Sequence, residues 1–266
     1  MKFKNAAVLA AGLFISGAAF AGPVVSGFNS NTLAGNDDGS TGLVNIGFTV
    51  NFFGNEYSRL YVNNNGNVTF DYALGIYTPF ELTNTNRVII APFFADVDTR
   101  YAGSPVTYGV GEYNGQSAFG VNWVNVDYYA SSSSHTARNS FQLILVDRSD
   151  IDSGDFDIVF NYDSIQWETG TASNGSPAGL GGYSARVGWS NGTGGEGSFF
   201  ELAGSAVNGA FLNGGSNALA GKTYTFEVRN GIVSPPIPTI PEPETWAMLL
   251  AGLGIVGAIS KRRRQG

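Results

Sequence analysis

Residues 60–70 read Leu-Tyr-Val-Asn-Asn-Asn-Gly-Asn-Val-Thr-Phe, and they give the clearest indication of fold class. Apolar and polar residues alternate on both sides of a short Asn-rich segment, which is typical of strands with one buried face. The Asn-Gly pair is a strong signal for a tight turn between two strands. The pattern therefore predicts a hairpin in which Leu60 and Val62 face Val68 and Phe70 across the turn.

Strand patterns continue on both sides of this hairpin. Upstream, Phe48, Val50 and Phe52 alternate with polar or small residues, which predicts a half-buried strand. Downstream, residues 88–94 form a continuous apolar run, as expected for a strand covered on both faces. Pro92 lies within this run and cannot donate a backbone hydrogen bond, so it favours a sheet edge or a bulge.

The rest of the central region has the same character. The alternation through Phe119, Val121 and Trp123 changes phase at Val124, which indicates a β-bulge. Further strand patterns occupy residues 141–146, 156–162, 185–189 and 224–228. Since no stretch between residues 22 and 231 keeps a helical period, the sequence predicts an all-β antiparallel sandwich, with a flattened barrel as the alternative.

Composition restricts the classes of function. Residues 22–240 contain 19 acidic and 8 basic side chains, a balance of −11, although the whole chain carries −7. Such a surface repels phosphate backbones and suits divalent cations or neutral glycans better, so we expect no nucleic-acid partner. The chain has no cysteine, which excludes thiol nucleophiles and disulfide-stapled modules.

The N-terminus has the features of a secretory signal. Lys2 and Lys4 precede an apolar run over residues 6–20, and Ala19-Phe20-Ala21 stands before Gly22. A positive start, a short apolar centre and small residues at Ala19 and Ala21 predict a signal helix that is cut between Ala21 and Gly22. Residues 1–21 would then be a signal peptide.

The C-terminus carries three elements in order. A Pro-rich linker over residues 231–240 precedes the elements Pro241-Glu242-Pro243, an apolar run over 246–260 that begins at Trp246, and the basic cluster Arg262, Arg263 and Arg264. Fifteen helical residues reach only about 22 Å, short of the roughly 30 Å hydrocarbon core, so this is a marginal transmembrane helix. The basic cluster should stay cytoplasmic, which leaves the Pro-Glu-Pro segment outside.

This tail resembles the PEP-CTERM sorting signal over residues 241–266. The resemblance implies processing by an exosortase, removal of the tail, and a Gram-negative host that makes exopolysaccharide. It also implies an exported protein at the cell surface or outside the cell, held only transiently at the inner membrane. A plain single-pass anchor is the alternative.

Within the central region, several blocks resemble a nidogen-like (NIDO) domain between Asn31 and Val228. They are residues 31–33, 36–40, 48–54, 61–70, 91–100, 156–162, 165–170 and 187–189. Phe94 stands where the family often has Trp. The resemblance implies an extracellular module associated with cell–matrix adhesion, and it places this domain at residues 22–230.

Three sets of polar residues are candidates for chemistry. His135 is the sole histidine and lies in a Ser-rich segment without a serine-hydrolase motif, so we expect a solvated loop residue. Asp96 and Asp98 have a spacing that a glycosidase carboxylate pair could use, but turn capping and ion pairing with Arg87 or Arg100 is favoured. The acidic turn at residues 150–157 fails the EF-hand pattern, because Gly154 falls at the fifth position.

No set of catalytic, cofactor-binding or metal-binding residues follows from these patterns. The sequence therefore predicts a non-enzymatic surface or matrix protein, with cell–matrix adhesion or an exopolysaccharide- and biofilm-associated role. A glycan-binding module is the first alternative, with Trp123, Trp167 and Trp189 as candidate sugar platforms, although strand residues of this kind usually pack in the core. A glycoside hydrolase that uses Asp96 and Asp98 is the second alternative.

Overall fold

The computed structural model describes residues 24–101, 105–130, 135–235 and 237–239. Almost all regular structure in these residues is β. The exceptions are two one-turn 3-10 helices, η1 (Leu82–Asn84) and η2 (Thr171–Ser173). The prediction of an all-β domain is confirmed.

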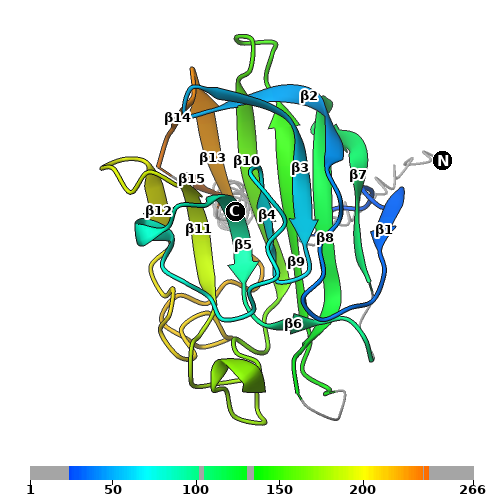
Figure 1. Ribbon diagram of the computed structural model, residues 1–266, viewed down its shortest axis with the longest axis vertical. Helices are drawn as coiled ribbons and strands as arrows, with labels where there is room; N and C mark the ends of the chain where they lie inside the picture. The colour runs from blue at the N-terminus through cyan, green and yellow to red at the C-terminus, as the bar shows by residue number, and fades with distance from the viewer. Residues whose placement is uncertain (1–23, 102–104, 131–134, 236, 240–266) are drawn as a thin grey trace, which may run out of the picture.

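The described strands form two antiparallel sheets (Figure 1). The larger sheet contains β1 (Asn31–Leu33), β6 (Val97–Asp98), β7 (Val106–Tyr113), β8 (Gln116–Tyr128), β9 (Asn139–Asp147), β10 (Phe156–Ser164), β13 (Thr223–Arg229), β14 (Ile232–Val233) and β15 (Ile237–Thr239). The smaller sheet contains β2 (Val44–Phe52), β3 (Asn55–Asn63), β4 (Asn67–Thr69), β5 (Val88–Phe94), β11 (Arg186–Asn191) and β12 (Phe199–Glu201).

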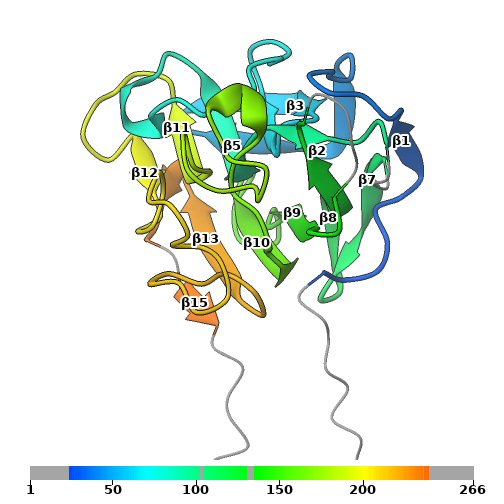
Figure 2. The same cartoon turned by 90° about the horizontal axis from the view of Figure 1, so that it is seen from below.

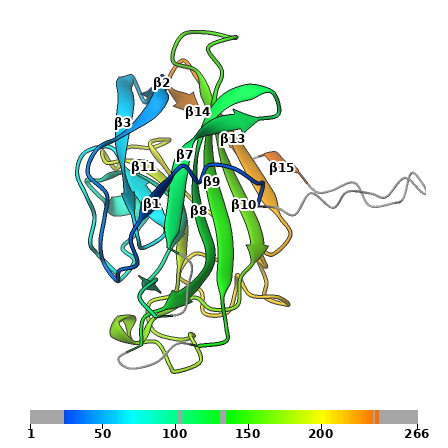
Figure 3. The ribbon, with the colours of Figure 1, turned by 90° about the vertical axis from the view of Figure 1, so that its right-hand side faces the viewer.

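The two sheets lie face to face as the layers of a sandwich (Figure 3). The main path of the larger sheet runs β1-β7-β8-β9-β10-β13-β14, and the smaller sheet runs β12-β11-β5-β4-β3-β2. Each path has two ends, so the described strands form a sandwich and no closed barrel. This decides between the two predicted architectures.

Inward-facing side chains of both sheets make one large core between the layers. Its largest fully buried members include Trp123, Trp167, Tyr162, Phe52 and Phe93. Two smaller clusters lie on the outer faces. One packs residues 25–28 against the larger sheet, and the other packs residues 74–82 against β5 of the smaller sheet.

The predicted hairpin over residues 60–70 is present as β3 and β4. Tyr61 pairs with Thr69 and Val62 with Val68, which is the predicted register. The turn between the strands is buried throughout, with Asn64 0% exposed. Gly66 has a φ of +73°, and a Cβ added there would lie 1.8 Å from the carbonyl oxygen of Phe93, so only glycine fits.

Both predicted irregularities in the strands are present. Pro92 lies in β5 opposite a register shift in β11, so it lies at a bulge in a central strand and not at a sheet edge. The register of β8 shifts between Trp123 and Val126, where Asn125 has a φ of +57°. Val124 lies at this bulge and is partly exposed.

The described chain begins and ends on the side of the larger sheet (Figure 2). Strands β14 and β15 lie within the predicted linker at residues 231–240, and both pair with β13. Among the described residues, none belongs to a helix that is long and apolar enough to cross a membrane. The predicted signal helix and the predicted transmembrane helix at 246–260 both lie outside the described residues.

Candidate functional site

Asp96 lies at the corner where the chain passes from one sheet to the other. Strand β5 ends at Phe94 in the smaller sheet, and β6 pairs Val97 with Tyr128 of β8 in the larger sheet. The Asp96 carbonyl accepts a hydrogen bond from the Tyr129 amide at 3.0 Å, which fixes the corner. Gly170 packs directly on the carboxylate, since a Cβ there would lie 2.2 Å from Asp96 Oδ2.

The buried Asn-rich turn brings the β1–β2 loop to this corner. Asn64 Nδ2 donates to the carbonyls of Asp37 and Val97, and therefore joins the loop to β6. Asn65 Nδ2 donates to Asp38 Oδ1 at 2.8 Å. Local sequence alone would place such a turn at the surface, but each of these amide groups finds a hydrogen-bond partner within the fold.

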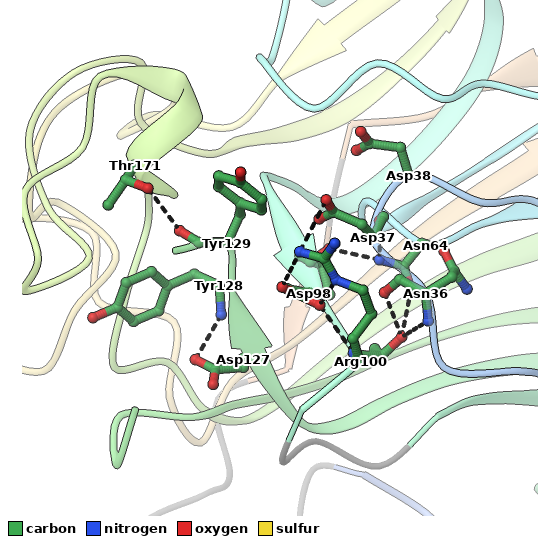
Figure 4. A network of polar contacts seen from close by, with 12 residues as sticks. Asn36, Asp37, Asp38, Asn64, Asp98, Arg100, Asp127, Tyr128, Tyr129 and Thr171 are labelled. Atoms are coloured by element: carbon green, nitrogen blue, oxygen red, sulfur yellow. Dashed lines mark hydrogen bonds and ion pairs between the residues drawn. The ribbon is translucent and has the colours of Figure 1, made fainter. Parts of the chain in front are cut away.

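Three carboxylates converge as a result, and we call Asp37, Asp38 and Asp96 the acidic cluster. Their oxygen atoms lie within 4.8 Å of one another. Together with Tyr77, Tyr129 and Ala172 they line a pocket of about 140 Å³. Figure 4 shows Asp37 beside the Arg100 guanidinium, with Asp38 on the same β1–β2 loop.

The electrostatics of the cluster are strongly perturbed. Burial, followed by repulsion from Asp37 and Asp38, raises the pKa of Asp96 to about 8, although a hydrogen bond from Ser173 opposes the shift. Burial also raises the pKa of Asp37 to about 6, with repulsion from Asp38 and Asp98 added and attraction to Arg100 opposing. Asp96 therefore tends to hold a proton at neutral pH when no other cation is present.

Asp98 is not free to act with Asp96. Its carboxylate accepts hydrogen bonds from the Arg100 backbone amide at 2.9 Å, from Nε at 3.0 Å and from Nη2 at 2.7 Å. Ion pairing with Arg100 is the predicted role of this residue, and it is confirmed for Asp98. Asp96 forms no ion pair among the described residues, and Arg87 pairs with Asp71 at 3.8 Å.

His135 is held more firmly than the sequence predicted. Its Nδ1 lies 2.9 Å from Asp127 Oδ1, and its ring stacks on Tyr128 at 3.9 Å. Arg138 also pairs with Asp127 at 3.0 Å. The expectation of a solvated loop residue was wrong, because an aromatic face and a buried carboxylate were available from β8.

The acidic turn at residues 150–157 contains carboxylates that already have partners. Arg148 contacts Asp150 at 3.1 Å and Asp157 at 3.0 Å, and Arg229 contacts Asp157 at 2.7 Å. Asp155 Oδ1 accepts a hydrogen bond from the backbone amide of Asn230 at 2.7 Å. The turn therefore joins strands β9, β10 and β13, in keeping with the failed EF-hand pattern.

The three candidate sugar platforms are core residues. Trp123, Trp167 and Trp189 are all buried. The indole nitrogens of Trp123 and Trp167 donate to backbone carbonyls at 2.9 and 3.1 Å, respectively. The expectation of core packing is confirmed, and these rings present no surface to a glycan.

The predicted processing residues lie outside the described part of the chain. They are Ala19, Ala21, Gly22, Pro241, Glu242, Pro243, Trp246, Arg262, Arg263 and Arg264. Sequence reasoning missed the clustering of Asp37 and Asp38 with Asp96. The Asn-Asp-Asp-Gly segment at 36–39 is a visible turn signal, but nothing local relates it to a distant sheet corner.

Comparison with known proteins identifies two regions. Residues 17–228 match the family described as NIDO related, and residues 239–264 match the PEP-CTERM protein-sorting motif. The second match covers the Pro-Glu-Pro segment, the apolar run and the Arg cluster. No solved structure gives a significant match.

Curated relatives extend the first match. Alpha-tectorin of Mus musculus is 37% identical over 192 residues, which is 64% of this chain and 8% of the relative. Alpha-tectorin of Gallus gallus is 33% identical over 192 residues, with 64% and 9% covered. Nidogen of Drosophila melanogaster is 26% identical over 218 residues, with 72% and 15% covered. The chain thus matches less than a tenth of the length of the alpha-tectorins. With most of its length matched, the chain belongs to the NIDO-related family.

Proposed function

We propose that this chain is an exported, non-enzymatic protein of a bacterial surface or extracellular matrix. The observation that carries the proposal is the order of its two matches, a NIDO-related domain over 17–228 and a PEP-CTERM sorting motif over 239–264. A sorting motif delivers the domain outside the cell. There the domain would connect the cell to an exopolysaccharide-rich layer or to other matrix components.

The chemistry of the described residues supports a non-enzymatic role. The candidate carboxylate pair is divided, because Asp98 forms an ion pair with Arg100 and only Asp96 is left to act. We expect a screen of glycosidase and esterase substrates to give no turnover that depends on these carboxylates. Turnover that the double variant Asp96→Asn and Asp98→Asn abolishes, with circular dichroism unchanged, would support the glycosidase alternative.

The sorting motif supports processing by an exosortase. We propose that residues 1–21 are removed on export, that residues 22–230 fold as the domain, and that the tail 241–266 holds the protein only transiently. The apolar run 246–260 would reach about 22 Å as a helix, which is short for a permanent span. Its Arg cluster would keep the end in the cytoplasm while the Pro-Glu-Pro segment is read outside.

Intact-mass measurement of the protein from its own host tests this proposal. We expect most mature molecules to lack the peptide after the Pro-Glu-Pro segment. The triple variant Arg262→Ala, Arg263→Ala and Arg264→Ala should accumulate unprocessed or mis-sorted protein. If most wild-type molecules still carry Lys261 to Gly266, the plain anchor is the correct interpretation.

The matrix role needs a binding test. Purified protein should be retained by exopolysaccharide from its own host, and deletion of the gene should weaken the attachment of cells to their matrix. Polysaccharide from a bacterium without PEP-CTERM proteins is the control. Equal retention on both materials, with normal attachment of the deletion strain, would contradict an adhesive role.

A glycan-binding surface is the second candidate, and one groove favours it. The groove has a volume of about 330 Å³ on the outer face of the larger sheet, between β7 and β13. Tyr113, Gln116, Arg148 and Asp157 line it and combine an aromatic ring with polar groups suited to hydroxyls. Tyr113→Ala should reduce retention on the polysaccharide, whereas Tyr183→Ala, an exposed tyrosine elsewhere, should not.

A further inference from the structure

When its carboxylates are ionised, the acidic cluster carries more negative charge than its neighbours balance. Among the described residues, Arg100 is the one cation that forms ion pairs here, at 2.7 Å from Asp98 and 3.1 Å from Asp37. Neither Asp38 nor Asp96 has an ion-pair partner in the same part of the chain. Two carboxylates therefore converge on a pocket without a compensating positive group.

The second observation concerns Asp96 itself. The residue is 1% exposed and lines the pocket, yet among the described residues its carboxylate accepts a single hydrogen bond, from the Ser173 hydroxyl at 3.5 Å. That distance is at the outer limit of hydrogen bonding. A second oxygen, Asp37 Oδ1, is buried with no hydrogen-bond partner. Buried carboxylates in proteins are normally paired or bound to a metal, so these oxygens point to a missing cationic ligand.

We propose that the acidic cluster binds one calcium ion. The donors are oxygens from three carboxylates, and neither histidine nor cysteine lines the pocket, which disfavours zinc and copper. The pocket, at about 140 Å³, leaves space for water ligands beside the ion. Calcium accepts six to eight oxygens in irregular geometry, whereas magnesium demands a near-ideal octahedron.

An ion here would join two segments that the sandwich brings together from separate parts of the sequence. Asp37 and Asp38 belong to the β1–β2 loop, and Asp96 belongs to the β5–β6 corner between the sheets. Calcium would therefore fasten one end of the sandwich and stabilise the folded state. This inference is independent of the proposed matrix role, because it concerns an ion and not a polysaccharide.

The test uses the full-length protein, stripped with EDTA and dialysed, and calorimetric titration with CaCl₂. We expect one ion per chain with a dissociation constant near 10⁻⁴–10⁻³ M, the range of extracellular modules. Asp96→Asn and Asp38→Asn should each weaken binding at least about tenfold, because each removes a charged ligand. Asp152→Asn, in the exposed acidic turn, is the matched control and should bind as wild type does.

Thermal unfolding gives a second readout. Calcium should raise the unfolding midpoint of the wild type and of Asp152→Asn but not of Asp96→Asn. Without calcium, Asp96→Asn should melt no lower than wild type, because the amide has nearly the same shape and leaves no buried carboxylate without an ion-pair partner. If Asp96→Asn does not fold, the same two measurements on Asp38→Asn test the proposal. Absence of saturable binding up to about ten times the expected constant, equal binding of magnesium, or wild-type binding by the cluster variants would overturn the proposal.

Discussion

Two polar turns connect neighbouring strands, and their surroundings are opposite. The β3–β4 turn, residues 63–67, is buried throughout, and its amides hold the β1–β2 loop and the β5–β6 corner. The β9–β10 turn, residues 148–155, exposes Asp150 and Asp152, and it pairs Asp150 with a neighbouring arginine. Polar composition alone therefore does not place a turn at the surface. A polar turn can be buried when its groups find partners.

The largest expected difference between the turns is at their glycines. In Gly66→Ala the new Cβ would lie 1.8 Å from the Phe93 carbonyl oxygen at a φ of +73°. The backbone cannot move aside as a flexible side chain can. We therefore expect the free energy of unfolding to fall by more than about 4 kcal/mol, or the variant not to fold. In Gly154→Ala the φ of +82° alone should cost roughly 1–2 kcal/mol, and the contact with the Asn51 Cβ at 2.9 Å adds to it, but the total should stay below that of Gly66→Ala. Urea unfolding measures the loss of stability in each variant. Similar losses in the two variants would contradict the expected difference between the turns.

Removal of a turn side chain should have the next largest effect. Asn64→Ala loses a part-buried bond to the Asp37 carbonyl and buried bonds to the Val97 carbonyl and the Thr99 hydroxyl. The free energy of unfolding should fall by about 3 kcal/mol, because buried polar groups lose their partners. Asp152→Ala in the other turn should change it by less than about 0.5 kcal/mol. A small effect of Asn64→Ala in urea unfolding would mean that water replaces the amide.

The pH dependence of stability should distinguish the acidic cluster from the acidic turn. In EDTA, the pKa of Asp96 is raised to about 8 by burial, then by Asp37 and Asp38, and further by Asp98, against a hydrogen bond from Ser173. A raised pKa means that the folded state binds the proton more tightly. The stabilisation is full below the ordinary carboxyl pKa and is lost as pH rises through about 8.

Urea midpoints between about pH 5 and pH 9 measure this effect. The wild type should lose stability with rising pH more steeply than Asp96→Asn, which cannot ionise. Asp37 is present in both proteins. Because its pKa is about 6, its titration changes the stability of both proteins equally in the lower part of this pH range. Parallel curves for the two proteins would show that Asp96 does not titrate in this range.

The smallest expected effect is at the exposed ion pair of the acidic turn. A hydrogen bond from Arg148 lowers the pKa of Asp150, so this group stabilises the fold above its ordinary pKa and stops doing so as pH falls. Asp150→Asn should shift the urea midpoint only slightly at neutral pH, and about 0.5 M salt should abolish the shift by screening. A large, salt-resistant shift would show that the turn depends on this pair.

Local sequence patterns were enough to predict individual strands, turns and bulges. Alternation and turn residues predicted the β3–β4 hairpin and its register, an edge or a bulge at Pro92, and the phase change after Trp123, because strand periodicity and turn chemistry depend on neighbouring residues. The same local reasoning named Arg100, two residues from Asp98, and Arg87 as the two possible ion-pair partners, and the structure pairs Asp98 with Arg100. It also identified the tryptophans as core residues, from their place in alternating strands.

Which carboxylates meet depends on the way the chain folds in three dimensions. Asp96 and Asp98 are near in sequence, yet Asp98 pairs with Arg100 while Asp96 joins Asp37 and Asp38 from another part of the chain. The cause is the passage of the chain from β5 in one sheet to β6 in the other, together with a buried Asn turn that holds the β1–β2 loop against it. Burial and repulsion between charges depend on distances in space, so no periodicity along the chain could have predicted this site.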